Sequence, residues 1–227
     1  MEHDEQPSFQ EWQTTLTAFQ LAYGFLSKAL YEPPQAEFVR QLFADDLFAD
    51  WPLAAADRHT RSGLHLLRAR GDAWRLEALK EDYAALFVGP PLLAHPWESV
   101  YRSEEGIIFD ETTLQVREIY RQFGLQAPLA NHEPDDHLGL ELALMVHLCG
   151  LGIAACEQED IAALDHALGA QRFFLDDHLL RWAPACLGLV IQRARTDYYR
   201  GVAHLGLGTL HAAAGLFALE SDILERE

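Results

Sequence analysis

The segment NHEPDDHLGLELALMVHLCGLGIAACE, residues 131–157, joins a cluster of charged residues to a long apolar run. Four acidic residues and two histidines lie within its first twelve positions, 131–142. The apolar run has the length and periodicity of a buried helix, which we expect over 134–157. The same periodicity dominates the rest of the chain, without a convincing alternating strand pattern. The sequence therefore predicts an all-α fold.

The first helix is indicated by its own start and stop signals. Ser8 and Glu11 have capping-box spacing, apolar residues follow every three or four positions, and Pro33 and Pro34 end the helix. Further helices are expected at about 34–44, 53–70, 72–89, 112–123, 160–180, 184–195 and 198–219. The prediction is eight or nine helices in a single-domain bundle covering 1–227, with loose termini at 1–7 and 220–227.

Local chemistry suggests several helix boundaries. Asp72 and Asp197 are expected to be N-caps, Gly124 to close the helix before it, and Pro184 to precede a new helix. The stretch GPPLLAHPWESVYRSEEGIIFD, residues 89–110, lies between the expected helices 72–89 and 112–123, and it has three prolines and no helical period. It is too apolar for disorder, so we expect one long ordered loop packed over the bundle.

The charge balance restricts the partners. Against 17 Lys and Arg stand 35 Asp and Glu, and the formal net charge of −18 repels nucleic acid and anionic lipid and attracts a basic partner. The alternative is that the acidic excess only keeps the protein soluble.

The three cysteines, Cys149, Cys156 and Cys186, lie in apolar helical surroundings without a CxxC pair, which is typical of reduced core thiols in a cytoplasmic protein. The acidic N-terminal residues lack the features of a signal peptide, and no run of 18 uninterrupted apolar residues suggests a membrane-spanning helix.

The acidic cluster has a structural explanation. If Pro134 is the first helical residue, then Glu133, Asp135 and Asp136 lie in or beside the first turn, where the helix dipole stabilises negative charge. This explanation leaves His137 unexplained. A second explanation is a binding site for a peptide with cationic and apolar parts, because carboxylates accept guanidinium groups in bidentate fashion. The apolar part of the peptide would meet a groove formed by Tyr83, Leu86, Phe87 and Trp97.

An enzyme is the weaker alternative. His137 and Glu141 are one helical turn apart, and His132 and Glu133 are adjacent, so a metal-dependent hydrolase or oxidase is conceivable. However, the chain has no Glu-x-x-His, HExxH or Cys/His zinc spacing, no phosphate-binding glycine loop and no GxSxG. We therefore expect no catalytic residues, no metal and no cofactor.

Three stretches together resemble a known family. DYAALFVGPPLLAHPWESVY (82–101), NHEPDDHLGLELALM (131–145) and FFLDDHLLRWAPACLGLVIQRARTDYY (173–199) are similar, in order and spacing, to the TorD/DmsD family of redox-enzyme maturation chaperones. This family is related to the nitrate reductase delta-subunit-like chaperones. The resemblance extends over roughly residues 10–219.

The resemblance implies an all-helical cytoplasmic chaperone without enzymatic turnover. Its expected partner is the twin-arginine signal peptide of a molybdopterin oxidoreductase of the DMSO or TMAO reductase type, bound before export. An alternative within the family is a chaperone that acts mainly on the enzyme body during cofactor insertion. The client, the release trigger, guanine-nucleotide binding and the choice between a monomer and a domain-swapped homodimer stay open.

The family's signal-peptide region carries over onto short motifs of this sequence. Asp136, assisted by Glu133, is expected to pair with the arginines of the leader, and His95 stands where many members have a proline. The remaining positions are Asp136 and His137 in E-P-x-D-H, Pro96 and Trp97 in P-W-x-S-V, Leu86 and Phe87 in L-F-x-G-P, and Tyr83 where some members have Trp.

Each of these positions also has a structural interpretation. Leu86 and Phe87 fit the core face of a helix, and Trp97 fits a plug that fixes the loop. His137 would hydrogen-bond a neighbour or make the site pH-sensitive. His178 and Trp182 are expected to be structural, with His178 at a helix end.

Overall fold

The computed structural model describes residues 7–44, 47–69, 74–103, 106, 108–128 and 133–219. Within these ranges every regular element is helical, which confirms the all-α prediction. Except for Pro7, the expected loose ends at 1–7 and 220–227 lie outside the described residues, as do the proposed N-cap Asp72 and His132 of the acidic cluster.

The helices follow the expected order, with an additional short helix inside the loop 89–110. In chain order the elements are α1 (Phe9–Tyr31), α2 (Ala36–Ala44), α3 (Arg58–Arg68), α4 (Leu76–Tyr83), a π-helical turn (Ala84–Val88), α5 (Glu98–Arg102), α6 (Glu111–Gln122), α7 (Leu138–Glu157), α8 (Ile161–Phe174), a second π-helical turn (Leu175–Leu179), α9 (Leu180–Arg193) and α10 (Asp197–Leu216).

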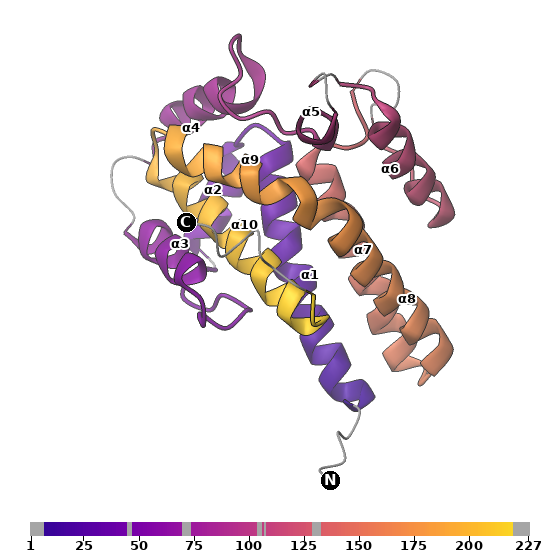
Figure 1. Cartoon of the computed structure of the whole chain (residues 1–227). Helices are drawn as coiled ribbons and strands as arrows, with labels where there is room; N and C mark the ends of the chain where they lie inside the picture. Colours follow the sequence, from indigo (N-terminus) through magenta and orange to yellow (C-terminus); the bar gives the residue numbers. More distant parts are fainter. Residues whose placement is uncertain are drawn as a thin grey trace.

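The core forms where α1 packs along α7 and α10 packs against α3 and α9 (Figure 1). α1 begins as predicted, because the Ser8 hydroxyl accepts a hydrogen bond from the Glu11 amide and the Glu11 carboxylate accepts one from the Ser8 amide. At the other end of α1 the backbone of α7 comes close. A Cβ on Gly139 would collide with the Cβ of Tyr31 and lie 3.0 Å from its Cα, so only glycine fits there.

α7 is long and apolar enough to cross a membrane by length and composition. Within the fold it packs against α1 and α8, and 61% of its most apolar 18-residue window is buried. This burial is typical of the core helix of a soluble protein, and the membrane criterion is weak evidence by itself. The cysteines agree with the prediction, since Cys149, Cys156 and Cys186 are all buried and free.

The start of α7 differs from the prediction. The helix begins at Leu138 with His137 as its N-cap, so Pro134 is not its first residue. Glu133, Asp135 and Asp136 lie in the turn before the helix, and they do not complement its dipole from the first turn. The physical reason is a distant partner, because the Leu138 amide donates to the carbonyl of Pro96 at 2.8 Å and fixes the entry of the chain.

Two further boundaries were predicted wrongly. Thr196, and not Asp197, caps α10, because its hydroxyl accepts from the amide of Tyr199. Pro184 lies inside α9, and helical structure runs from α8 through the second π-helical turn into α9 without a break at this proline. Trp182, Pro184 and Cys186 are all buried, so this part of α9 packs into the core.

Candidate functional site

The two motifs with the richest chemistry lie side by side, although about forty residues separate them in the chain. The loop before α5 and the turn before α7, residues 133–137, form an antiparallel bridge between Trp97 and His137. Besides the bond to Pro96, the amide of Glu98 donates to the carbonyl of Asp136 at 3.0 Å. We call this unit, residues 96–99 with 133–138, the paired turn.

Asp136 is the centre of the paired turn. Its side chain is fully buried, and its Oδ2 accepts from the amide of Ser99 at 2.7 Å, while its Oδ1 accepts from the hydroxyl of Thr113 at 3.0 Å. Burial raises the pKa of Asp136, and these hydrogen bonds oppose the rise. Because Ser99 lies in the first turn of α5, Asp136 caps that helix from outside, and it ties α5, α6 and the turn together.

His137 is locked in the same unit. Its Nδ1 accepts from the amide of Gly139 at 3.0 Å, and its ring meets the rings of Tyr31 and Trp97 edge-on. Complete burial lowers the pKa of His137 to about 3. The imidazole is therefore neutral at physiological pH, and the expectation that it makes the site pH-sensitive near neutrality is wrong.

The neighbouring carboxylates differ in their exposure. Asp135 is buried, and its Oδ2 accepts from both Nε and Nη2 of Arg117, at 2.8 and 2.6 Å. Glu133 is half-buried and accepts from the hydroxyl of Tyr31 at 3.0 Å. Burial, followed by the negative charge of Glu133, raises the pKa of Tyr31 to about 12. Among the described carboxylates of this turn, Glu133 is the one that solvent reaches most easily.

A second buried polar cluster extends from Glu98 of the paired turn to α7 and the segment 175–182. Glu98 is fully buried, and its two oxygens bond Arg102 Nη1 at 2.6 Å and His178 Nδ1 at 2.9 Å. Trp182 Nε1 donates to Oε2 of Glu141 at 3.1 Å. Burial, then the charges of Glu98 and Asp136, raise the pKa of Glu141 far above its ordinary value. Trp182 is buried as predicted, whereas His178 pairs with Glu98 and does not satisfy a helix end.

The aromatic and apolar residues predicted for the site form its floor. Tyr83, Leu86 and Phe87 are all buried at the end of α4 and in the first π-helical turn. The hydroxyl of Tyr83 donates to the carbonyl of Tyr31 at 2.6 Å, so this floor joins the paired turn through Tyr31. Pro96 is buried and Trp97 is half-buried. The structure thus brings the predicted residues into one region, and most of them are closed to a ligand in this conformation.

An exposed apolar groove lies beside the paired turn and was not predicted. Phe109, Thr113, Leu114 and Arg117 line a cavity of about 260 Å³ on α6. Phe109 and Leu114 are 47% and 58% exposed, and the neighbouring Ile108 is also exposed. Thr113 and Arg117 are the same residues that bond Asp136 and Asp135, so the groove and the acidic turn share a wall. The sequence signal was Leu114, which lies on the opposite side of α6 from the apolar residues Val116, Ile119 and Tyr120.

The metal alternative has no supporting geometry in the part of the chain that the structure describes. No group of three or more His, Cys, Asp or Glu side chains lies in an arrangement suited to a metal ion there. The two residues of the hypothesis have other partners, since His137 Nδ1 accepts from Gly139 and Glu141 accepts from Trp182.

Comparison with known proteins identifies the family to which this chain belongs. The model of the nitrate reductase delta subunit family matches residues 52–187, which is more than half of the chain and includes both halves of the paired turn. The chain belongs to the TorD/DmsD family. The resemblance inferred from the three sequence stretches is thereby confirmed.

Relatives within the TorD/DmsD family cover most of the chain. The Tat proofreading chaperone DmsD of Salmonella typhi is 30% identical over 198 residues, which cover 85% of this chain and 87% of the relative. The chaperone protein TorD of Vibrio cholerae is 32% identical over 166 residues, covering 73% of each chain. Both are named as chaperones and not as enzymes, in agreement with the prediction of a chaperone for redox-enzyme maturation.

Proposed function

We propose that this protein acts in the cytoplasm, where it binds the twin-arginine signal peptide of a redox-enzyme precursor and delays export until the enzyme is mature. The expected client is a molybdopterin oxidoreductase of the DMSO or TMAO reductase type. Support comes from the relatives named Tat proofreading chaperones and from the chemistry around the paired turn.

The observation that carries the proposal is the shared wall between an acidic turn and an exposed apolar groove. A twin-arginine leader offers two guanidinium groups followed by an apolar segment. Glu133 and Asp135 supply carboxylates for the guanidinium groups, and Phe109 and Leu114 supply apolar surface beside them. One extended peptide can reach both features without a large movement of the bundle.

Arg117 has a particular place in this proposal. It occupies Asp135 with two nitrogens and remains partly exposed, with 21% of its side chain accessible. A guanidinium group from the leader can therefore replace an internal guanidinium group, so that Asp135 is never left buried without a partner. In the free protein Arg117 therefore occupies the position at Asp135 that an arginine of the leader would take.

The buried residues of the predicted site have a supporting role in this proposal. Asp136 and His137 fix the paired turn, and Tyr83, Leu86 and Phe87 form the floor below Tyr31. Pro96 and Trp97 hold the loop against the turn. Direct contact of a leader with Asp136 would require the loop to open, because both oxygens of this carboxylate already accept hydrogen bonds.

Titration calorimetry with a synthetic leader tests the proposal. The leader comes from a molybdoenzyme encoded beside this chain, and the control leader has Lys-Lys in place of Arg-Arg. Binding at micromolar strength, about −8 kcal/mol, that weakens with Lys-Lys supports it. If no leader binds while a client lacking its leader does, the protein acts on the enzyme body instead.

A further inference from the structure

α3 is basic in an acidic protein. Residues 58–75 hold five of the 17 Lys and Arg residues against a single acidic residue, Asp72, in a chain whose formal net charge is −18. Besides the half-buried His59, α3 carries Arg58, Arg61, His65 and Arg68, and these four are exposed. Their spacing of three or four positions places them on one face of the helix.

The arginines of this face are without a carboxylate ion pair in the part of the chain that the structure describes. Some basic side chains elsewhere in the described residues pair with carboxylates, as in Arg40 with Glu37 and Arg181 with Asp176. No described carboxylate forms an ion pair with the three arginines of α3. The one acidic residue at the start of α3, Asp57, accepts from the amides of His59 and Thr60 and serves as the N-cap.

Backbone carbonyl groups hold two of these guanidinium groups in place. Arg61 Nη1 donates to the carbonyl of Ala56 at 2.6 Å, and Arg68 Nε donates to the carbonyl of Phe48 at 2.6 Å. Neutral carbonyl groups orient the arginines without cancelling their charge. Since a guanidinium group has five N–H donors, each retains donors for another ligand. The side chains are therefore positioned before any partner arrives, which lowers the entropic cost of binding.

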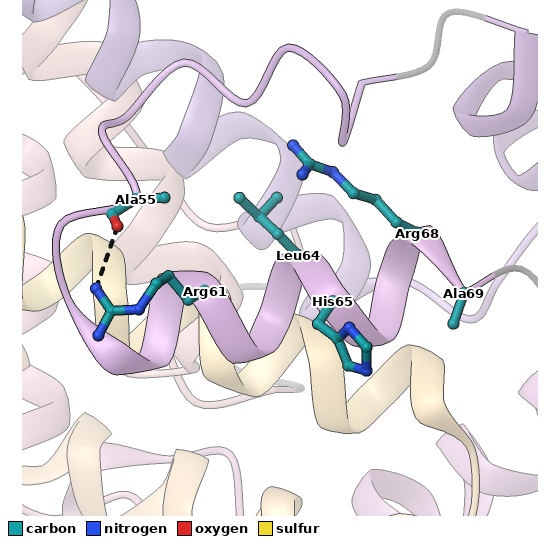
Figure 2. A pocket seen from close by; sticks show the side chains of 6 residues that line it. All are labelled: Ala55, Arg61, Leu64, His65, Arg68 and Ala69. Atoms are coloured by element: carbon teal, nitrogen blue, oxygen red, sulfur yellow. Dashed lines mark hydrogen bonds between the residues drawn. The ribbon is translucent and has the colours of Figure 1, made fainter.

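The same residues line an open cavity. Arg61, Leu64, His65 and Arg68 form a surface hollow of about 400 Å³ together with Ala55 and Ala69. Figure 2 shows Arg61 reaching the carbonyl of Ala55, and Leu64 and Arg68 projecting to one side of α3. The hollow thus has cationic ends and a small apolar middle.

We propose that this face of α3 is a docking surface for an acidic segment of a protein partner. Arg61 and Arg68 are seven positions apart, which corresponds to about 10 Å along the helix. That spacing exceeds the reach of one phosphate group. It matches two carboxylates three residues apart on a peptide in the polyproline II conformation, which has three residues per turn and rises about 3.1 Å per residue, so that both carboxylates lie on the same side. The ligand is chemically opposite to a basic leader, so this surface and the paired turn recognise different parts of a client or different proteins.

Fluorescence anisotropy with labelled acidic peptides tests the proposal. The probe is an eight-residue peptide with two glutamates three positions apart around alanines, and the control peptide has glutamines instead. We expect roughly tenfold tighter binding of the glutamate peptide at about 50 mM salt, and loss of the difference at high salt because surface charges are then screened. Equal binding of the two peptides would overturn the proposal.

Matched variants locate the binding on the protein. His65→Glu adds a negative charge to the face without removing either held arginine, and Arg193→Gln changes the net charge by the same amount on the exposed end of α9. The proposal requires that His65→Glu weaken the glutamate peptide roughly threefold or more and that Arg193→Gln leave it within about twofold. Equal effects would mean that only the net charge matters and would refute it.

A competition experiment separates an acidic peptide from a small anion. Inorganic phosphate is added at a concentration equal to the dissociation constant of the peptide. If phosphate displaces the peptide at that concentration, the hollow is a phosphate site and the docking proposal is wrong. Persistence of the peptide at that phosphate concentration supports it. The outcome does not depend on the leader, because neither the probe nor the variants involve the paired turn.

Discussion

Glu141→Gln is the substitution whose effect follows most directly from the buried cluster. Glu141 is fully buried, and burial with the nearby charges of Glu98 and Asp136 raises its pKa far above the ordinary value. The native protein therefore keeps a proton on Glu141 at pH values at which the unfolded chain has already released it. Glutamine imitates the protonated acid, and its carbonyl oxygen still accepts from Trp182 Nε1.

The sign of the effect follows from proton linkage. Above the unfolded pKa of Glu141 and below its folded pKa, the native state binds one more proton than the unfolded state, so stability falls as pH rises. One extra bound proton corresponds to about 1.4 kcal/mol for each pH unit between these two pKa values. The glutamine variant lacks this loss, so its free energy of unfolding should exceed that of the wild type by an amount that grows with pH.

His137 changes the stability with pH in the opposite direction to Glu141, so the pH dependence of the wild type alone does not isolate the contribution of Glu141. Its folded pKa of about 3 means that the native state resists protonation and loses stability as pH falls below about 6.5. Both proteins share this contribution, and it cancels in their difference. The measurement is therefore the difference in unfolding between variant and wild type at each pH.

Thermal unfolding at pH 5, 6 and 7 is a suitable assay. For a chain of this size, 1 kcal/mol shifts Tm by roughly 2–4 °C, so the Tm difference should grow by roughly 3–6 °C for each pH unit in which only the native state holds the proton. Glu81→Gln on the exposed face of α4 is the matched control. A Tm difference that stays constant with pH would refute the conclusion that Glu141 is protonated in the native state.

Four other substitutions give separate tests. Arg117→Ala should tighten leader binding about fivefold, near 1 kcal/mol by calorimetry, because Asp135 is then available to the peptide. Weaker binding would contradict the proposal that an arginine of the leader replaces Arg117. Leu114→Ser should reduce leader affinity severalfold while thermal stability changes by less than about 0.5 kcal/mol, since its side chain is exposed, and unchanged affinity would exclude the groove. Asp136→Ala should lower the free energy of unfolding in urea by about 2–4 kcal/mol, because Ser99 and Thr113 lose a buried acceptor, and a neutral result would argue against the paired turn. Gly139→Ala should cost about 1–3 kcal/mol or more in the same assay through its collision with α1, whereas Gly169→Ala on α8, with open space around it, should not destabilise the protein.

Features fixed by neighbours in the sequence were predictable. The capping box of α1 depends on Ser8 and Glu11 alone, and the burial of the cysteines follows from the apolar helices that carry them. Gly124 ends α6 with a positive φ of 69°, which again is a local property.

Features fixed by distant partners were not predictable. The acidic residues before α7 resemble a helix start, and the sequence contains no sign that Pro96 and Ser99 supply the bonds that move this start to Leu138. The burial of these acidic residues could not be predicted either. A carboxylate such as Asp135 is expected at the surface until its partner Arg117, on another helix, is known.

The central claim is that a twin-arginine leader binds where the paired turn meets the α6 groove. Photo-crosslinking tests it most directly, with a leader that carries a benzophenone group immediately after the arginine pair and with mass-spectrometric mapping of the attached residues. The account predicts crosslinks within 108–117 and 133–138, and their loss with the Lys-Lys leader. Crosslinks concentrated on α3 or spread evenly over the surface would contradict it.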